Sequence, residues 1–314
     1  MVETASTRDA YGKTLVRLGK NDPKVIVLDA DLSKSTMTKY FAQEFPERFF
    51  DMGLAEQNMM SVAAGLAAAG KTPFASTFSV FAAGRPFDQL RVSIAQPRLN
   101  VKVVATHVGI SVGEDGASHH AIEDLALACS LPGFTVIVPS DATETEQAIE
   151  IASQTPGPFY IRLCRPAVPV LHGPDYRLRI GKAEELHPGA DATIIALGIM
   201  VAPALEAARS LHDSGIACRV LNMATLKPLD IEAVVRAARE TGAIVAAEEH
   251  LQHGGLGSAI AQVVAETCPV PMAFVAIHDV YTKSGKPDEL LQSRKLTAQD
   301  IAEAAKSVLP RKGR

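Results

Sequence analysis

The sequence predicts an α/β protein with two domains, each a mostly parallel sheet with helices on both faces. The chain has 314 residues, more than one typical domain contains. Short β-branched runs alternate with longer stretches rich in alanine and leucine, as in parallel sheets with helical crossovers. Residues 171–191 shift to proline, glycine and charge without a sustained period, which predicts a linker or a peripheral strand. We therefore place the domains at 1–185 and 186–314.

The strands expected in the first domain are apolar along nearly their whole length, as strands buried on both faces are. They are VIVLDAD (25–31), VKVVATH (101–107), FTVIVPS (134–140) and FYIRLC (159–164). A helix is expected to begin near Ala55 and to stop at Gly70, a residue type that often ends helices. The small residues of this helix would permit close approach of another helix, so it suits an interface.

The second domain shows the same alternation on a smaller scale. Its expected strands are ATIIALG (192–198), ACRVLNMA (217–224), AIVAAEE (243–249) and MAFVAI (272–277). Helical patterns lie at 201–213, 229–240 and 256–267. This order again predicts a parallel sheet with crossover helices.

Composition indicates which kinds of partner and which compartment the sequence favours. Lys and Arg number 31 against 35 for Asp and Glu, so the net charge of −4 gives no reason to expect nucleic acid or a membrane. The N-terminus lacks an apolar signal core, and no apolar run reaches about 18 residues. The four cysteines fit neither a disulfide framework nor a zinc site and are expected to be buried thiols. We expect a cytoplasmic protein whose partner is a small molecule or another protein.

Polar residues follow several strands at the point where each strand ends. Asp31 ends the first strand and Ser35 follows it, Glu56 comes after FFDMG (49–53), His107 ends a later strand, and Arg165 follows another. Ligands of open parallel sheets bind at the carboxyl ends of the strands. These residues could therefore face one crevice.

The loop 107–120, HVGISVGEDGASHH, combines three histidines with Glu114 and Asp115 among glycines. Glycines let the backbone approach a ligand while imidazoles and carboxylates point inward. A metal site is the alternative. His119 and His120 are adjacent, however, and lack the spacing of helical zinc ligands, so no metal ligand is expected in this chain.

Each residue also has an ordinary structural role open to it. Glu56 could favour the positive end of a helix dipole, and Phe78 and Phe81 could be core aromatics. In the same way, Arg8 and Arg165 could form surface ion pairs, whereas Asp31 and Ser35 could cap the following helix.

Three motifs in order, MGLAEQNM, TFSVF and ATHVGISVGEDGASHH, resemble the pyrimidine-binding domain of transketolases. Further on, AAEEHLQHGGLGSAIA and SGKPDELL resemble the C-terminal domain of that family. The resemblance begins near Arg8 and covers nearly the whole chain. It implies transfer of a two-carbon ketol unit from a ketose phosphate to an aldose by means of thiamine diphosphate.

The resemblance also implies roles for single residues. Glu56 matches the glutamate that hydrogen-bonds the pyrimidine nitrogen N1′ of the cofactor, and Phe78 and Phe81 match the aromatic residues around that ring. Asp31 resembles an acidic residue near the cofactor at the subunit contact. Where the family often has a further aromatic residue, this chain has Gly84, which predicts a more open pocket.

The substrate residues are assigned in the same way. The positions that match contacts to the substrate phosphate are Arg8, Ser35, His107 and Arg165, and His107 is also counted as catalytic. Asp115 matches the residue that contacts the substrate C2 hydroxyl, and His119 matches a histidine of the same loop. Together these matches favour a sugar-phosphate substrate.

One family signature is missing. The sequence contains no G-D-G followed at a suitable distance by Asn, the motif that binds Mg²⁺ and the diphosphate. The resemblance therefore implies an N-terminal transketolase subunit that carries this domain and the Mg²⁺ ligands, in a heterotetramer. Met1, just before the usual domain start, favours a natural split gene over a chain cut from a longer enzyme.

Other functions stay open. The beta subunit of a 2-oxo acid dehydrogenase shares both domains and the glutamate, but it needs no sugar-phosphate contacts such as Arg8, Ser35 and His107. Deoxyxylulose-phosphate synthase normally replaces the T-H before the glycine loop and has an undivided chain. A non-catalytic regulatory subunit would have no need for Glu56 or Asp115. The pathway served, whether pentose phosphate metabolism or a specialised sugar pathway, is left undecided.

Overall fold

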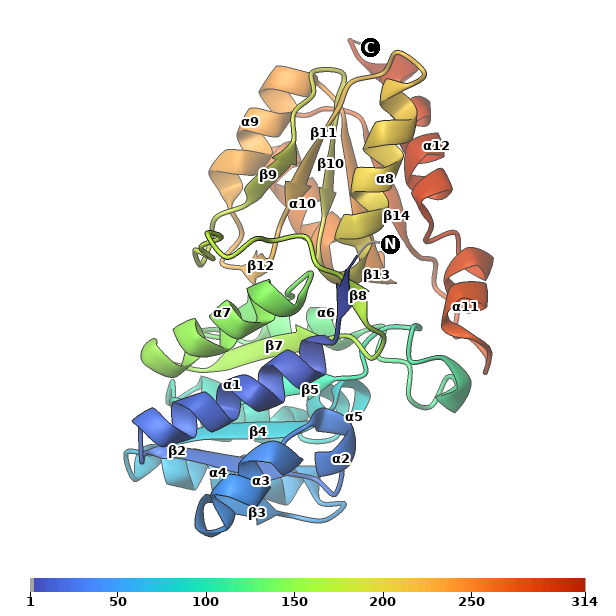
Figure 1. The fold of residues 1–314 in the computed structure, drawn as a ribbon. Helices are drawn as coiled ribbons and strands as arrows, with labels where there is room; N and C mark the ends of the chain where they lie inside the picture. Colours follow the sequence, from blue (N-terminus) through green and yellow to red (C-terminus); the bar gives the residue numbers. More distant parts are fainter. Residues whose placement is uncertain (1–2, 314) are drawn as a thin grey trace.

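The computed structural model describes residues 3–313, which form two large sheets stacked end to end along the molecule (Figure 1) and one small two-stranded sheet. The first sheet has the strand order β12-β6-β7-β5-β4-β2-β3, and all neighbours pair in parallel except β12 with β6. Its strands are β2 (Val25–Asp29), β3 (Phe49–Asp51), β4 (Thr72–Phe78), β5 (Lys102–Thr106), β6 (Thr135–Ile137), β7 (Phe159–Leu163) and β12 (Thr225–Lys227).

Helices cover both faces of this sheet. On one face lie α1 (Thr7–Asn21), α3 (Lys39–Glu44) and α7 (Ala142–Gln154), which contribute Tyr11, Phe41 and Ile149 to one apolar core. On the other face lie α4 (Glu56–Ala68), α5 (Ser79–Gly84), a π-helical segment (Gln89–Ala95) and α6 (Asp124–Ser130). Caps define their ends locally: Ser6 accepts a hydrogen bond from the Asp9 amide at the start of α1.

The second sheet has the order β14-β13-β10-β11-β9, and β9 pairs with β11 as an antiparallel edge strand. Its strands are β9 (Glu184–His187), β10 (Ala192–Ala196), β11 (Cys218–Asn222), β13 (Ile244–Leu251) and β14 (Met272–Ile277). α8 (Val201–His212) and α12 (Ala298–Val308) pack on one face, and α9 (Ile231–Thr241) and α10 (Leu256–Thr267) pack on the other. The predicted α/β class, with two mostly parallel sheets and helices on both faces, is confirmed.

The two halves share contacts. One apolar cluster includes Met59 and Leu90 of the first half together with Val234, Leu256 and Ile260 of the second. β12 lies within the proposed second domain in sequence but pairs with β6 of the first sheet. Two short strands, β1 (Thr4–Ala5) and β8 (Val168–Pro169), pair as a separate antiparallel sheet. The remaining short elements are α2 (Ser33–Thr36), α11 (Pro287–Ser293) and the 3₁₀ turns Pro46–Arg48, Gly113–Asp115, Gly198–Met200 and Leu309–Arg311.

Two expectations need correction. Residues 134–140 form a strand only over Thr135–Ile137, although the amide of Val138 still donates to the carbonyl of Ala224, the residue before β12. All four cysteines are free, but only Cys164 and Cys218 are buried, whereas Cys129 and Cys268 are partly exposed. Among the described residues, no helix has both the length and the apolar character needed to cross a membrane.

Candidate functional site

Most of the predicted site residues gather at the carboxyl edge of the first sheet. Arg8, in the first turn of α1, donates from Nη1 to the carbonyl of Ser35 at 2.6 Å and from Nη2 to the carbonyl of Arg165 at 2.8 Å. This one guanidinium therefore joins α1, α2 and the end of β7. Its Nε is buried and has no hydrogen-bond partner among the described residues. Burial lowers the pKa of Arg8, and the charge of Arg165 adds to this effect.

Arg165 reaches from the end of β7 to the loop 107–120. Its Nη1 donates to the carbonyl of Val112 and lies 3.1 Å from a carboxylate oxygen of the exposed Glu114. The surface ion pair that the sequence analysis considered for Arg165 is thus present, with Glu114 as its partner. The same contacts hold the guanidinium beside the loop that carries the predicted substrate residues.

His107 lies at the centre of this edge and is only 4% exposed. Its φ of 56° is in the left-handed region, and Nδ1 lies 3.0 Å from the hydroxyl of Thr106. The imidazole stacks on Phe78 with 3.8 Å between ring centroids. Burial and the charges of Arg8 and Arg165 lower the pKa of His107 to about 3. The ring is therefore neutral at physiological pH and can both donate and accept a hydrogen bond.

Two phenylalanines form a flat wall next to His107. The rings of Phe78 and Phe81 are 6.0 Å apart and nearly parallel, and His119 meets Phe81 edge-on at 5.3 Å. Phe78 is 7% exposed and belongs to the buried core, as the ordinary alternative expected, whereas Phe81 is half-buried. A Cβ added at Gly84 would meet no atom within 4 Å.

Glu56 is the first residue of α4 and is 4% exposed. Its carboxylate accepts a hydrogen bond from Arg85 Nη1 at 2.5 Å, and the guanidinium carbon of Arg85 lies 3.8 Å from the centroid of Phe81. The helix-dipole role also applies to Glu56 at this position. The sequence analysis missed Arg85. Arg85 follows Phe81 by four residues, about one helical turn, and this spacing could have indicated that the two side chains lie together.

Asp31 and Asp115 stay apart from this group. Asp31 is exposed, and its amide donates to a carboxylate oxygen of Asp51 at 3.0 Å. Asp115 is exposed on the 3₁₀ turn of the loop. The hydrogen bonds and ring contacts described for residues 3–313 join neither residue to the other site residues. The capping role considered for Asp31 and Ser35 is wrong, because α2 begins after Leu32 without a side-chain cap.

The buried carboxylate of Asp29, which the sequence analysis also missed, organises α2. It accepts hydrogen bonds from the amide of Leu32 at 2.6 Å and from the hydroxyls of Thr36 at 2.7 Å and Thr38 at 2.8 Å. Burial raises the pKa of Asp29 to about 6. These bonds fix the turn that places Ser35 against Arg8.

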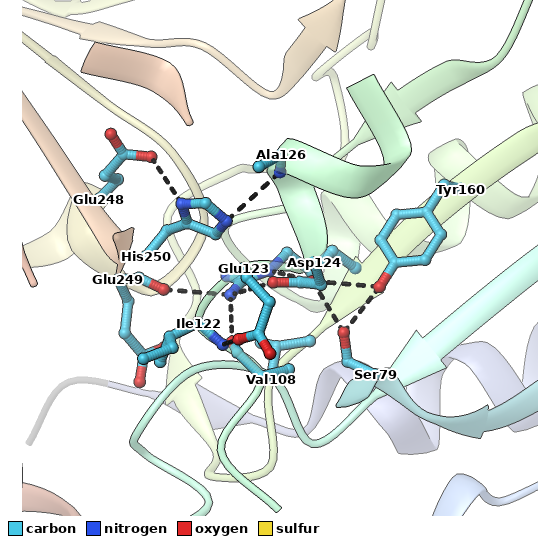
Figure 2. A network of polar contacts seen from close by, with 12 residues as sticks. Ser79, Val108, Ile122, Glu123, Asp124, Ala126, Tyr160, Glu248, Glu249 and His250 are labelled. Carbon is cyan, nitrogen blue, oxygen red and sulfur yellow. Dashed lines mark hydrogen bonds and ion pairs between the residues drawn. The ribbon is translucent and has the colours of Figure 1, made fainter. Parts of the chain in front are cut away.

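A second network of polar contacts surrounds Asp124 (Figure 2). The guanidinium of Arg162 on β7 binds both carboxylate oxygens of Asp124, at 2.8 and 3.1 Å, and donates to the carbonyl of Glu249 at 3.0 Å. Asp124 also accepts from the hydroxyl of Ser79, the neighbour of Phe78, at 2.7 Å. Burial opposes ionisation of Asp124, but the charge of Arg162 holds the pKa of this carboxyl below its ordinary value.

Two further features concern metals and anions. The structure of residues 3–313 contains no group of three or more His, Cys, Asp or Glu side chains able to hold a metal ion. At the start of α10, the amides of Leu256 and Gly257 bind the carboxylate of Glu248 at 2.7 and 2.8 Å. An internal anion therefore occupies the helix start that follows Gly254-Gly255.

Comparison with known proteins shows to which family the chain is similar. Residues 3–170 match the model of the transketolase pyrimidine-binding domain, and residues 181–301 match that of the transketolase C-terminal domain. A putative transketolase C-terminal section from Methanocaldococcus jannaschii is 45% identical over 94% of this chain and 93% of its own length. The 6-deoxy-6-sulfo-D-fructose transketolase subunit SqwH of a Clostridium species is 43% identical over 97% and 95%. A solved structure described as a split gene transketolase, inactive beta4 tetramer, superposes with a TM-score of 0.92 at 55% identity and covers 98% of this chain and 99% of its own.

Proposed function

Because the chain belongs to the transketolase family and is a transketolase subunit, we propose that it transfers a two-carbon ketol unit from a ketose phosphate to an aldose. We propose further that it does so only together with a chain that carries the diphosphate-binding domain. The observation that carries the proposal is the buried carboxylate of Glu56 beside the wall of Phe78 and Phe81, next to the cationic group around Arg8.

These residues fit the aminopyrimidine of thiamine diphosphate. Two nearly parallel aromatic rings provide a flat apolar surface, and Glu56 provides a hydrogen-bond partner in a poorly solvated place. When bound, the cofactor supplies a carbon centre able to stabilise negative charge beside the bond that is broken. In our proposal Glu56 holds a proton at the ring nitrogen N1′, and Phe78 and Phe81 orient the ring and exclude water.

The cationic group fits the phosphate of the substrate. Arg8 and Arg165 can bind phosphate oxygens through their guanidinium groups, and neutral His107 and the hydroxyl of Ser35 can add hydrogen bonds. The Nε of Arg8 is buried and lacks a hydrogen-bond partner among the described residues, which supports the proposal that a phosphate oxygen accepts a hydrogen bond from it. We assign the substrate C2 hydroxyl to Asp115 and a contact in the same loop to His119.

The rest of the assembly is also a proposal. We place the Mg²⁺ ligands on the partner chain, with Asp31 at the contact, and expect a heterotetramer. Leu54 and Phe50, which are 76% and 43% exposed just before Glu56, support a protein contact there. The domain division at residue 185 and a cytoplasmic location complete the proposal. The four free cysteines are consistent with a reducing compartment.

Calorimetry and a ketol-transfer assay test this function. The full chain, alone and mixed with a diphosphate-binding transketolase subunit, is titrated with thiamine diphosphate and Mg²⁺. It is then assayed with xylulose 5-phosphate and with 6-deoxy-6-sulfo-D-fructose as donors, because a sulfonate also presents an anionic oxygen fork to Arg8. We expect tight binding and turnover only in the mixture. Turnover by the isolated chain would contradict the proposal that this chain holds only part of the cofactor site. A mixture that is inactive with both donors would contradict ketol transfer.

A further inference from the structure

The loop 107–120 leaves the first sheet after β5, yet the second half of the chain holds it. The amide of Ser111 donates to Glu249 Oε1 at 2.6 Å, and the Ser111 hydroxyl lies 3.3 Å from Oε2. Glu249 belongs to β13 of the second sheet. The amide of Gly109 donates to the carbonyl of Ala121 at 2.9 Å and closes the base of the loop. One carboxylate therefore connects the loop to the other domain.

The fit around this carboxylate is close. Gly109 has a φ of 65°, and a Cβ at this position would lie 2.1 to 2.4 Å from the carboxyl atoms of Glu249. Glu249 is 1% exposed, and its own carbonyl is held by Arg162 in the network of Figure 2. Neither the loop backbone nor the glutamate has room to shift without disturbing the other.

The later part of the loop meets the second half again. The ring of His120 hydrogen-bonds the hydroxyl of Thr282, and a Cβ at Gly116 would lie 2.6 Å from the hydroxyl oxygen of Ser284. These contacts involve residues 116–120, whereas Glu249 binds the first part of the loop, which directly follows His107.

We propose that Glu249 is a positioning residue that holds the loop in the conformation in which His107, Asp115 and His119 meet the substrate. This role rests on the proposed function, since the assignment of these three residues does. Loops carry functional side chains with precision only where a rigid scaffold fixes them. A small displacement of such residues reduces the productive orientation of the substrate. In this way the C-terminal half takes part in substrate binding without touching the substrate.

Matched variants separate this role from general stability. Glu249→Met keeps the length of the side chain and removes both acceptors, whereas Glu249→Gln keeps one acceptor and removes the charge. Glu248→Met is the control, because Glu248 is equally buried on the same strand but binds the amides of α10. If Glu249→Met fails to fold, Glu249→Gln against Glu248→Gln gives the same comparison.

Hydrogen exchange of the full chain provides the first readout. An unsatisfied buried amide is costly, so we expect the amides of residues 109–113 to exchange about tenfold faster in Glu249→Met. The increase should be smaller in Glu249→Gln, and Glu248→Met should affect the start of α10 instead. Equal exchange of the loop in Glu249→Met and Glu248→Met would overturn the proposal.

Steady-state kinetics with the partner chain provide the second readout. We expect the KM of the ketose phosphate to rise about tenfold in Glu249→Met, while the affinity for thiamine diphosphate stays within about twofold. A loosened loop with an unchanged KM would also overturn the proposal. If the wild-type mixture shows no ketol transfer, the proposed function fails by itself, and the exchange data alone then decide whether Glu249 holds the loop.

Discussion

At the scale of single residues, Glu56 combines burial with one close cationic neighbour. Its carboxylate is 4% exposed and binds Arg85, which lies over Phe81. Arg85 binds Oε1 of this carboxylate, and in our proposal the cofactor ring hydrogen-bonds the same carboxyl group.

Replacing Glu56 with glutamine tests this role. Glu56→Gln keeps the size of the side chain but removes its ability to hold the proton at N1′, so we expect turnover of the assembled enzyme to fall by about a hundredfold or more. The fall should be in kcat, measured with saturating thiamine diphosphate. Glu47→Gln, an exposed position on the same half, is the control. Full activity of Glu56→Gln would refute the acid-base role.

At the scale of secondary-structure elements, α10 begins on a buried carboxyl group. Glu248 on β13 accepts both amides at the helix start, and burial raises the pKa of this carboxyl to about 7. The ordinary pKa is 4.5, so between these values the folded chain holds a proton that the unfolded chain has released. The free energy of unfolding must therefore fall as the pH rises through this window, by up to about 1.4 kcal/mol for each unit of pKa shift.

Glu248→Gln removes this titration. We expect the unfolding temperature of the variant minus that of the wild type to increase as the pH is raised from 4.5 to 7 and to level off above it. Burial also raises the pKa of Glu249 to about 7, but Glu249 is present in both proteins and its contribution largely cancels. Calorimetric scans at several pH values measure the difference. A difference that is flat across this window would show that Glu248 does not titrate there.

At the scale of the whole molecule, the sequence predicts regular structure well because burial and period are local properties. The helix expected from Ala55 to Gly70 is found at Glu56–Ala68, and the strand expected at 101–107 is found at Lys102–Thr106. Residues that follow parallel strands could be expected at one edge, which is where His107 and Arg165 lie, whereas Arg8, which meets them there, was assigned through the resemblance alone. The fold class follows from the same local patterns.

Contacts between distant segments have no such signature. Ser111 and Glu249 are 138 positions apart, and nothing around either residue indicates the other. The same holds for β12, which leaves its own domain to pair with β6, and for Arg162, a charged residue within an apolar strand. These features depend on how the two halves pack, so they could be seen only in the folded chain.

The ion pair of Arg162 and Asp124 tests how far the two halves depend on each other. Both side chains are at most 2% exposed, and Arg162 also binds the carbonyl of Glu249 in the second half. Asp124→Ala leaves a buried guanidinium without its counter-charge, so we expect a loss of about 3 to 5 kcal/mol in the free energy of unfolding. Urea denaturation followed by probes in each half should show one shared transition at a lower midpoint.

The double variant Asp124→Leu with Arg162→Met provides the control, because it replaces both charges by apolar side chains of comparable size. Exchange of a buried ion pair for apolar residues is often close to neutral, so we expect the double variant to recover most of the lost stability. If the double variant is as unstable as Asp124→Ala, the hydrogen bonds of Arg162 to Ala121 and Glu249 matter more than its charge. If the two halves then unfold separately, these bonds are what couples the second sheet to the loop and edge where we place the substrate.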